Sequence, residues 1–127
     1  MPKIVLVVDD SPTIRGFCRL ALRPLSIEIA EAEEGAQALE AVRRAPPSLI
    51  IVDVNMPGMD GISFVRALRA DADAAVRGVP VLLLTGDRDA AIRARGLEAG
   101  ANEFVEKPIK PPALQQTVRR YLGEPAQ

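Results

Sequence analysis

Side chains that bind metal ions or phosphate groups follow the short apolar runs of this sequence. Two acids come after KIVLVV, a third ends LIIVD, a threonine ends VPVLLLT and a lysine ends NEFVEK. Clustered carboxylates are costly to ionise together without a cation. Oxygen ligands without histidine or cysteine favour Mg²⁺ or a similar hard ion. If they meet in the fold, these residues predict a divalent-ion site: Asp9, Asp10, Asp53, Thr85 and Lys107.

The same five residue types also suit phosphoryl transfer. A bound metal ion and Lys107 would neutralise phosphoryl oxygens, and Thr85 would donate a hydrogen bond to them. A carboxylate can itself attack phosphorus and form an aspartyl phosphate, and Asp53 is the central candidate. The chain contains no histidine and one cysteine, which excludes a zinc site or a histidine-based triad within it.

Alternating β-branched and amphipathic segments must position these residues. Strands are predicted at 3–8, 26–32, 49–53, 79–85 and 102–107. Helices are predicted from Ser11, as the N-cap, to about Arg23, and at 34–44, 61–70, 89–99 and about 111–122, with a loop at 71–78. Such alternation predicts an α/β fold with a doubly wound parallel sheet. Ligands of such sheets bind beyond the carboxyl ends of the strands.

Composition limits the classes of function. We expect one domain, 1–127, because the length is ordinary for a domain and 48% hydrophobic residues can form a core. A formal net charge of −1 argues against binding to nucleic acid or to an anionic membrane surface. No run approaches the length of a membrane span. Cys18 lies on an apolar helical stripe and is predicted to be a small buried residue. We expect a soluble cytoplasmic protein.

Each candidate residue also has an ordinary structural explanation. Asp9 and Asp10 suit the start of a helix, where acids are favoured. Asp53 could cap a turn, and a lone lysine such as Lys107 is usually solvated. Asp60 is predicted to cap the third helix rather than bind metal. The coincidence of five such residues at strand ends of one sheet edge favours the functional interpretation.

Four motifs carry a resemblance to a known family: VVDDSPTIR, IIVDVNMPGMDG, LLLTG and EAGANEFVEKPI. With these motifs, essentially the whole chain resembles the receiver domain of two-component response regulators, and the single-domain chemotaxis regulator in particular. The resemblance implies a flavodoxin-like five-stranded sheet in the order 2-1-3-4-5, flanked by five helices. It also implies a lone receiver domain without an output domain, with Mg²⁺ as its cofactor.

The resemblance assigns roles to individual residues. Asp9, Asp10, Asp53 and the backbone carbonyl of Asn55 would bind the metal, with Asp10 a direct ligand. Asp53 would accept a phosphoryl group from a partner histidine kinase. Thr85 and Lys107 would bind the phosphoryl oxygens. Phe104 matches the aromatic switch position that acts together with Thr85.

The output implied by the resemblance is a change of shape. The face formed by the segments 89–99, 102–107 and 111–122 would respond to phosphorylation, and a downstream protein would bind it. The chain would catalyse only its own phosphorylation and dephosphorylation, as a monomer or weak dimer. The alternative within this interpretation is a phosphorelay shuttle that passes its phosphoryl group to a histidine phosphotransfer protein.

Two other classes of function remain alternatives. A phosphohydrolase with an aspartyl nucleophile would use a second Asp two residues later, where this sequence has Asn55. A nucleotide- or flavin-binding module could share the fold. The sequence lacks a glycine-rich phosphate loop of the G-x-x-x-x-G-K type, and only 3% of its residues are aromatic.

Overall fold

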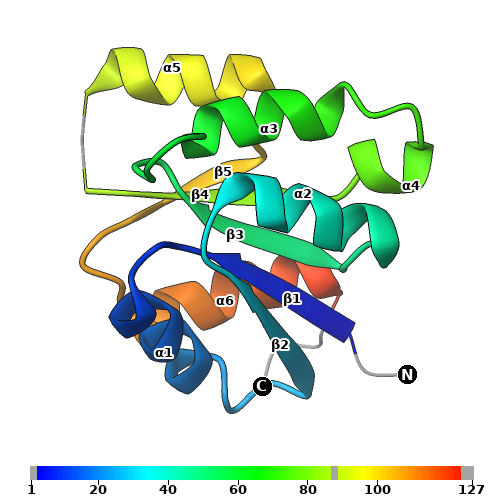
Figure 1. Ribbon diagram of the computed structural model, residues 1–127. Coiled ribbons are helices and arrows are strands. Elements are labelled where there is room, and N and C mark those ends of the chain that lie inside the picture. The colour runs from blue at the N-terminus through cyan, green and yellow to red at the C-terminus, as the bar shows by residue number, and fades with distance from the viewer. Residues whose placement is uncertain (1–2, 87–88, 124–127) are drawn as a thin grey trace.

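Five parallel strands form one sheet in the order β2-β1-β3-β4-β5, as Figure 1 shows. The computed structural model describes residues 3–86 and 89–123. This sheet confirms the predicted doubly wound, flavodoxin-like topology. The strands are β1 (Lys3–Val8), β2 (Ile27–Ala32), β3 (Leu49–Asp53), β4 (Val81–Thr85) and β5 (Glu103–Glu106).

Six helices are present in the described part of the chain, one more than predicted. The extra helix, α4, is a single turn in the segment 71–78 that was expected to be a loop. Asp73 initiates it by accepting a hydrogen bond from the Ala75 backbone N–H at 2.9 Å, and Val76 is buried beneath it. The helices are α1 (Pro12–Ala21), α2 (Gly35–Arg44), α3 (Gly61–Arg69), α4 (Ala74–Arg77), α5 (Ala90–Ala99) and α6 (Pro111–Leu122). None of the helices in this part of the chain is long and apolar enough to cross a bilayer.

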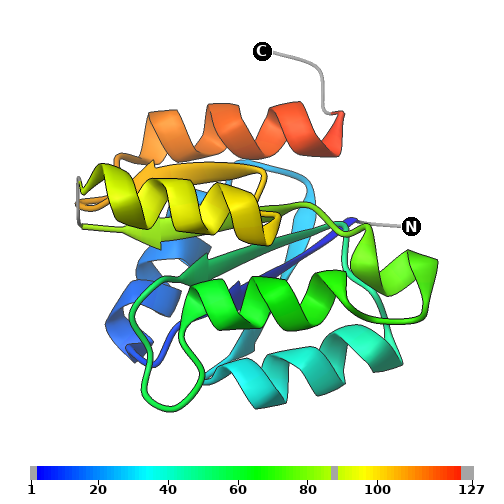
Figure 2. The same cartoon turned by 90° about the horizontal axis from the view of Figure 1, so that it is seen from above.

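Alternate residues of each central strand serve opposite faces of the sheet. In β1, Val5 and Val7 pack with α1 and α6, whereas Leu6 and Val8 pack with α2 and α3. Figure 2 shows α6 and α3 on opposite sides of the sheet. Since β3 and β4 are buried on both faces in the same way, only their ends can carry polar groups.

Two helices begin next to the carboxyl edge of the sheet with the caps that the sequence predicts. Ser11 Oγ accepts a hydrogen bond from the Ile14 N–H at 3.3 Å at the start of α1. Asp60 Oδ1 accepts one from the Ser63 N–H at 2.7 Å at the start of α3. Asp60 is therefore a helix cap, as expected. Cys18 of α1 is fully buried, and burial raises the pKa of its thiol to about 11.

The opposite, amino edge of the sheet is held by Arg69 at the end of α3. Its guanidinium donates to the carbonyl oxygens of Gly100 at 3.0 Å, Arg77 at 2.7 Å and Val79 at 2.6 Å. It also donates to Asn102 Oδ1 at 3.0 Å. Burial lowers the pKa of this guanidinium. One side chain thus joins the C-terminal ends of α3, α4 and α5 to the starts of β4 and β5.

Candidate functional site

Three buried polar side chains stand at the carboxyl edge of the sheet. Among the described residues, the buried polar or charged ones are Asp9, Asp53 and Thr85, exposed by 1%, 5% and 1%. They follow or end the neighbouring strands β1, β3 and β4. Buried polar groups are expensive unless they have partners or a ligand. Their coincidence at one edge marks this edge as the candidate site.

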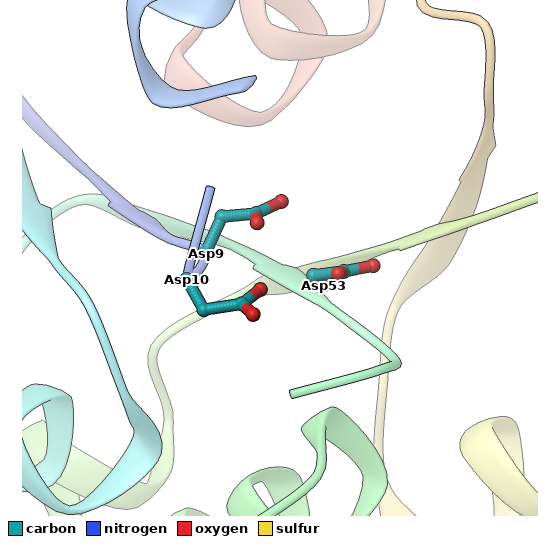
Figure 3. A group of neighbouring side chains, drawn as sticks. All are labelled: Asp9, Asp10 and Asp53. Atoms are coloured by element: carbon teal, nitrogen blue, oxygen red, sulfur yellow. The ribbon is translucent and has the colours of Figure 1, made fainter. Parts of the chain in front are cut away.

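The three acids of the sequence motifs lie close together. One carboxylate oxygen each from Asp9, Asp10 and Asp53 lies within 4.8 Å of the other two. Figure 3 shows the three carboxylates projecting into a shared space. Asp9 and Asp53 are buried, and Asp10 is exposed, so the cluster opens to solvent on the Asp10 side. The predicted convergence of these acids is therefore present in the fold.

The carboxylate of Asp9 lacks full compensation in the protein. Its Oδ1 accepts a hydrogen bond from the Ser11 N–H at 2.9 Å, but its buried Oδ2 has no hydrogen-bond partner. Lys107 Nζ lies 3.9 Å from Oδ2. Burial raises the pKa of the Asp9 carboxyl, the hydrogen bond from Ser11 lowers it, and the nearby charge of Asp53 raises it again. A buried carboxylate oxygen without a donor fits a cation, and the all-oxygen donor set fits Mg²⁺.

Lys107 connects the acids to the end of β4. Its Nζ donates to Asp53 Oδ1 at 3.0 Å. Its backbone N–H donates to the carbonyl oxygen of Thr85 at 2.9 Å. The peptide bond that follows, to Pro108, is cis. Because the Lys107 side chain is 27% exposed, its ammonium lies between the buried carboxylates and solvent.

The loop after Asp53 depends on a glycine at the start of α3. The Gly61 N–H donates to the carbonyl oxygen of Val54 at 2.9 Å. A Cβ on Gly61 would lie 2.3 Å from the backbone oxygen of Asp53, so no other residue fits there without moving the strand end. Asn55 is exposed in this loop, two residues after Asp53. The role of its carbonyl as a metal ligand stays a prediction.

Phe104 lies apart from the acids, in β5, where its partly buried ring packs against α5. A Cβ on Gly96 would lie 2.5 Å from the Cζ atom of this ring and 2.9 Å from Leu83 Cδ1. The guanidinium of Arg93 lies 5.3 Å from the ring centroid and pairs with Glu106 at 2.8 Å. The glycine inside α5 therefore makes room for the ring. The role of Phe104 as a switch stays a prediction.

Arg15 is a residue beside the site that the spacing of the motifs did not reveal. Its Nη1 donates to the carbonyl oxygen of Asp9 at 2.6 Å, and its Nε to Glu31 Oε1 at 2.9 Å. Arg19 also pairs with Glu31. Glu31 near the end of β2 thus holds arginines of α1 rather than joining the acid cluster. The signal in the sequence was a strand-end acid and a basic residue one turn into the preceding helix.

Comparison with known proteins identifies relatives of this arrangement. The family model described as the response regulator receiver domain matches residues 5–119. The DNA-binding response regulator MtrA of Mycolicibacterium smegmatis is 40% identical over 131 residues, which cover all of this chain and 55% of that protein. The chain therefore spans about half the length of this curated relative.

Solved structures resemble the chain in both fold and sequence. The chemotaxis protein CheY4 of Vibrio cholerae superposes with a TM-score of 0.87 at 34% identity, over 95% of this chain and 99% of that one. The receiver domain of the sensor histidine kinase PA1611 of Pseudomonas aeruginosa superposes with a TM-score of 0.86 at 30% identity, over 97% of this chain and 99% of that one. That structure is described with a magnesium ion coordinated in its active site cleft.

Proposed function

The chain belongs to the response regulator receiver domain family, and from this premise we propose that it is a phosphorylation switch. Asp53 accepts a phosphoryl group from a partner histidine kinase in a reaction that needs Mg²⁺. The observation that carries the proposal is the contact between Lys107 and Asp53 inside a cluster of three acids. A buried carboxylate oxygen of Asp9 without a hydrogen-bond donor supports the metal ion.

The chemical step uses the residues already gathered at the sheet edge. A carboxylate oxygen of Asp53 attacks phosphorus and forms a new O–P bond, while the bond from phosphorus to the donor nitrogen breaks and that nitrogen keeps the electron pair. Lys107, held 3.0 Å from Asp53, and the hydroxyl of Thr85 bind the transferred oxygens. Asp9, Asp10, Asp53 and the Asn55 carbonyl would hold Mg²⁺, which would supply further positive charge to the phosphoryl oxygens. The chain catalyses only this transfer and the later hydrolysis, in which water takes the phosphoryl group from Asp53 and inorganic phosphate leaves.

The output surface adjoins the same lysine. A hollow of 370 Å³ between β5 and α6 is lined by Phe104, Lys107, Lys110 and Thr117 among other residues. Phosphorylation adds about 1.5 to 2 negative charges beside Lys107. Movement of Lys107 and Thr85 toward the new group changes this hollow and the packing of Phe104 under α5. A downstream protein then binds the face formed by α5, β5 and α6 in one state more tightly than in the other.

The test is phosphorylation by acetyl phosphate, read as the gain of one phosphoryl group by intact-protein mass spectrometry. The wild type is expected to gain it with Mg²⁺ and to fail without it, and Asp53→Asn is expected to fail in both conditions. Glu40→Gln is the matched control, because this acid is exposed on α2 and pairs there with its helix neighbour Arg44. Labelling of Asp53→Asn at the wild-type level would exclude Asp53 as the acceptor.

The alternative use of the same chemistry is a phosphorelay shuttle. One of the similar structures is the receiver domain of a sensor histidine kinase, which gives this alternative its support. Incubation of the phosphorylated chain with a histidine phosphotransfer protein separates the two uses. A shuttle loses its phosphoryl group to that protein rapidly, whereas an effector keeps it and binds a target.

The kind of partner follows from charge and relatives together. The near-neutral chain supports a protein partner rather than nucleic acid for the receiver domain itself. The relative MtrA is a DNA-binding regulator of about twice this length, and CheY4 is a chemotaxis protein. A chemotaxis role and a cytoplasmic location stay predictions.

A further inference from the structure

Gly35 and Met59 make a close contact between the start of α2 and the loop that follows Asp53. Gly35 is buried, and it is the first residue of α2. A Cβ built on it would lie 2.8 Å from Met59 Sδ, 3.0 Å from Cγ and 3.1 Å from Cβ. The absent side chain of Gly35 thus leaves the space into which Met59 inserts.

Met59 belongs to the loop that carries Asn55, and that loop is fixed at its other points. Its two ends are joined by the hydrogen bond from the Gly61 N–H to the Val54 carbonyl at 2.9 Å. Met56 is buried in the core. The Met59 side chain packs on the same core cluster from the far arm of the loop. Its seat against Gly35 is therefore a close contact of this loop with the start of α2.

We propose that the contact between Gly35 and Met59 positions the loop for divalent-ion binding. The inference rests on the proposed function, since it assumes that Asn55 in this loop supplies a carbonyl ligand beside Asp53. Neither Gly35 nor Met59 is one of the predicted metal ligands. Both are positioning residues, which act through the backbone of the loop.

The geometry explains why a single methyl group at position 35 would weaken metal binding. Met59 Cβ and Cγ, and not only the tip of the side chain, lie against Gly35. Rotation of the methionine tip relieves the contact at Sδ, but Cγ and Cβ at 3.0 and 3.1 Å must also give by some tenths of an ångström, and Cβ moves only with the backbone of the loop. Mg²⁺ requires nearly ideal octahedral geometry with oxygen ligands at about 2.0–2.1 Å. A shift of that size at one ligand weakens binding.

The test is titration of the whole chain with Mg²⁺ alone, by isothermal calorimetry or by amide chemical shifts near Asp53. Gly35→Ala is expected to bind Mg²⁺ about tenfold more weakly than the wild type, in the range seen when supporting residues of metal sites are changed. In the background of Met59→Ala the same glycine substitution is expected to have a smaller effect, because Sδ and Cγ are then gone and only the contact with Cβ at 3.1 Å remains. Urea unfolding of each variant shows that it is folded.

Gly16→Ala is the matched control, because a Cβ on this glycine of α1 meets nothing within 4 Å. It is expected to bind Mg²⁺ like the wild type. Wild-type affinity in Gly35→Ala overturns the inference even if its stability falls, since the contact is then only structural. An equal loss of affinity from Gly35→Ala with and without Met59 also overturns it. Absence of Mg²⁺ binding by the wild type instead rejects the metal site of the proposed function.

Discussion

At the scale of single residues, the buried carboxylate of Asp9 costs stability when no cation is bound. Burial raises the pKa of its carboxyl above the ordinary value, so the folded protein disfavours the ionised form. Asp9→Asn keeps an oxygen for the Ser11 N–H and removes the charge. Without divalent ions at neutral pH, we expect the free energy of unfolding of this variant to be about 1 kcal/mol higher than that of the wild type. Urea denaturation measures the difference.

The pH dependence of that difference identifies its cause. The unfavourable contribution of Asp9 is fully present above its raised folded-state pKa, where both states are ionised. It disappears as the pH falls below the ordinary value of 3.8, where both states are protonated. The stability of wild type and Asp9→Asn should therefore converge toward pH 4 and below. A difference that stays constant over this range would point to packing rather than charge.

Saturating Mg²⁺ should reverse the order of the two proteins. The cation stabilises the wild type by an amount that grows with the logarithm of its concentration. Asp9→Asn lacks one charged ligand and should gain much less. Thermal unfolding with increasing Mg²⁺ measures this, and NaCl at matched ionic strength separates specific binding from screening. Equal stabilisation of both proteins would remove Asp9 from the metal site.

The sequence could predict the residues at this scale that lie at strand ends. Their side-chain types and their order along the chain indicate Asp9, Asp10, Asp53 and Lys107, because parallel strands share one carboxyl edge. Arg15 could not be assigned in the same way. Its contacts with the Asp9 carbonyl and Glu31 depend on how α1 lies across the ends of β1 and β2.

At the scale of elements, two glycines inside helices have opposite surroundings. A Cβ on Gly96 of α5 would lie 2.5 Å from the Phe104 ring and 2.9 Å from the buried Leu83, whereas Gly16 of α1 has open space. Alanine gains about 1 kcal/mol of helix propensity over glycine in either helix. At Gly96 overpacking costs about 1–3 kcal/mol and exceeds that gain.

Gly96→Ala is therefore expected to lower the free energy of unfolding, and Gly16→Ala to raise it. Urea denaturation of the two variants, with equal m-values, measures both. In the background of Phe104→Ala, the loss of stability caused by Gly96→Ala should be smaller than in the wild type, because one of the two obstructing side chains is then gone. Stabilisation by Gly96→Ala would mean that the ring does not lie against α5 in solution.

The turn and the contact that the sequence did not predict were missed for the same physical reason. The turn α4 has four residues, too few for the apolar periodicity that reveals a helix, and its support comes from the Asp73 cap and the buried Val76. The seat of Met59 on Gly35 joins α2 to a loop more than twenty positions away. Such contacts follow from the packing of finished elements and leave no local pattern.

At the scale of the whole molecule, Thr85 and Lys107 connect the site to the β5 edge of the sheet, where the proposed output face lies. Lys107 and Phe104 come from the edge strand β5 and its exit, and Thr85 from its neighbour β4. The other edge strand, β2, carries none of the predicted site residues. Signals from Asp53 should therefore travel toward α5, β5 and α6 and leave β2 unchanged.

Amide hydrogen exchange with beryllofluoride, Mg²⁺ and the intact chain measures this asymmetry. Exchange is expected to change in α5, β5 and α6 and to stay the same in β2 and α2. Asp53→Asn should show no change in any of these elements. A uniform change over the wild-type chain would indicate simple stabilisation by a ligand rather than a directed response.

The Arg69 clamp at the amino edge sets the form that any motion of α5 can take. Its guanidinium holds the carbonyl of Gly100, directly after the last residue of α5, to the ends of α3 and α4. The first turn of α5, near the end of β4, has no such anchor to Arg69. A displaced α5 would therefore swing about a pivot at Gly100, and its amplitude would grow toward Ala90. The helix would work as a lever with its fulcrum at the far edge from the phosphoryl group.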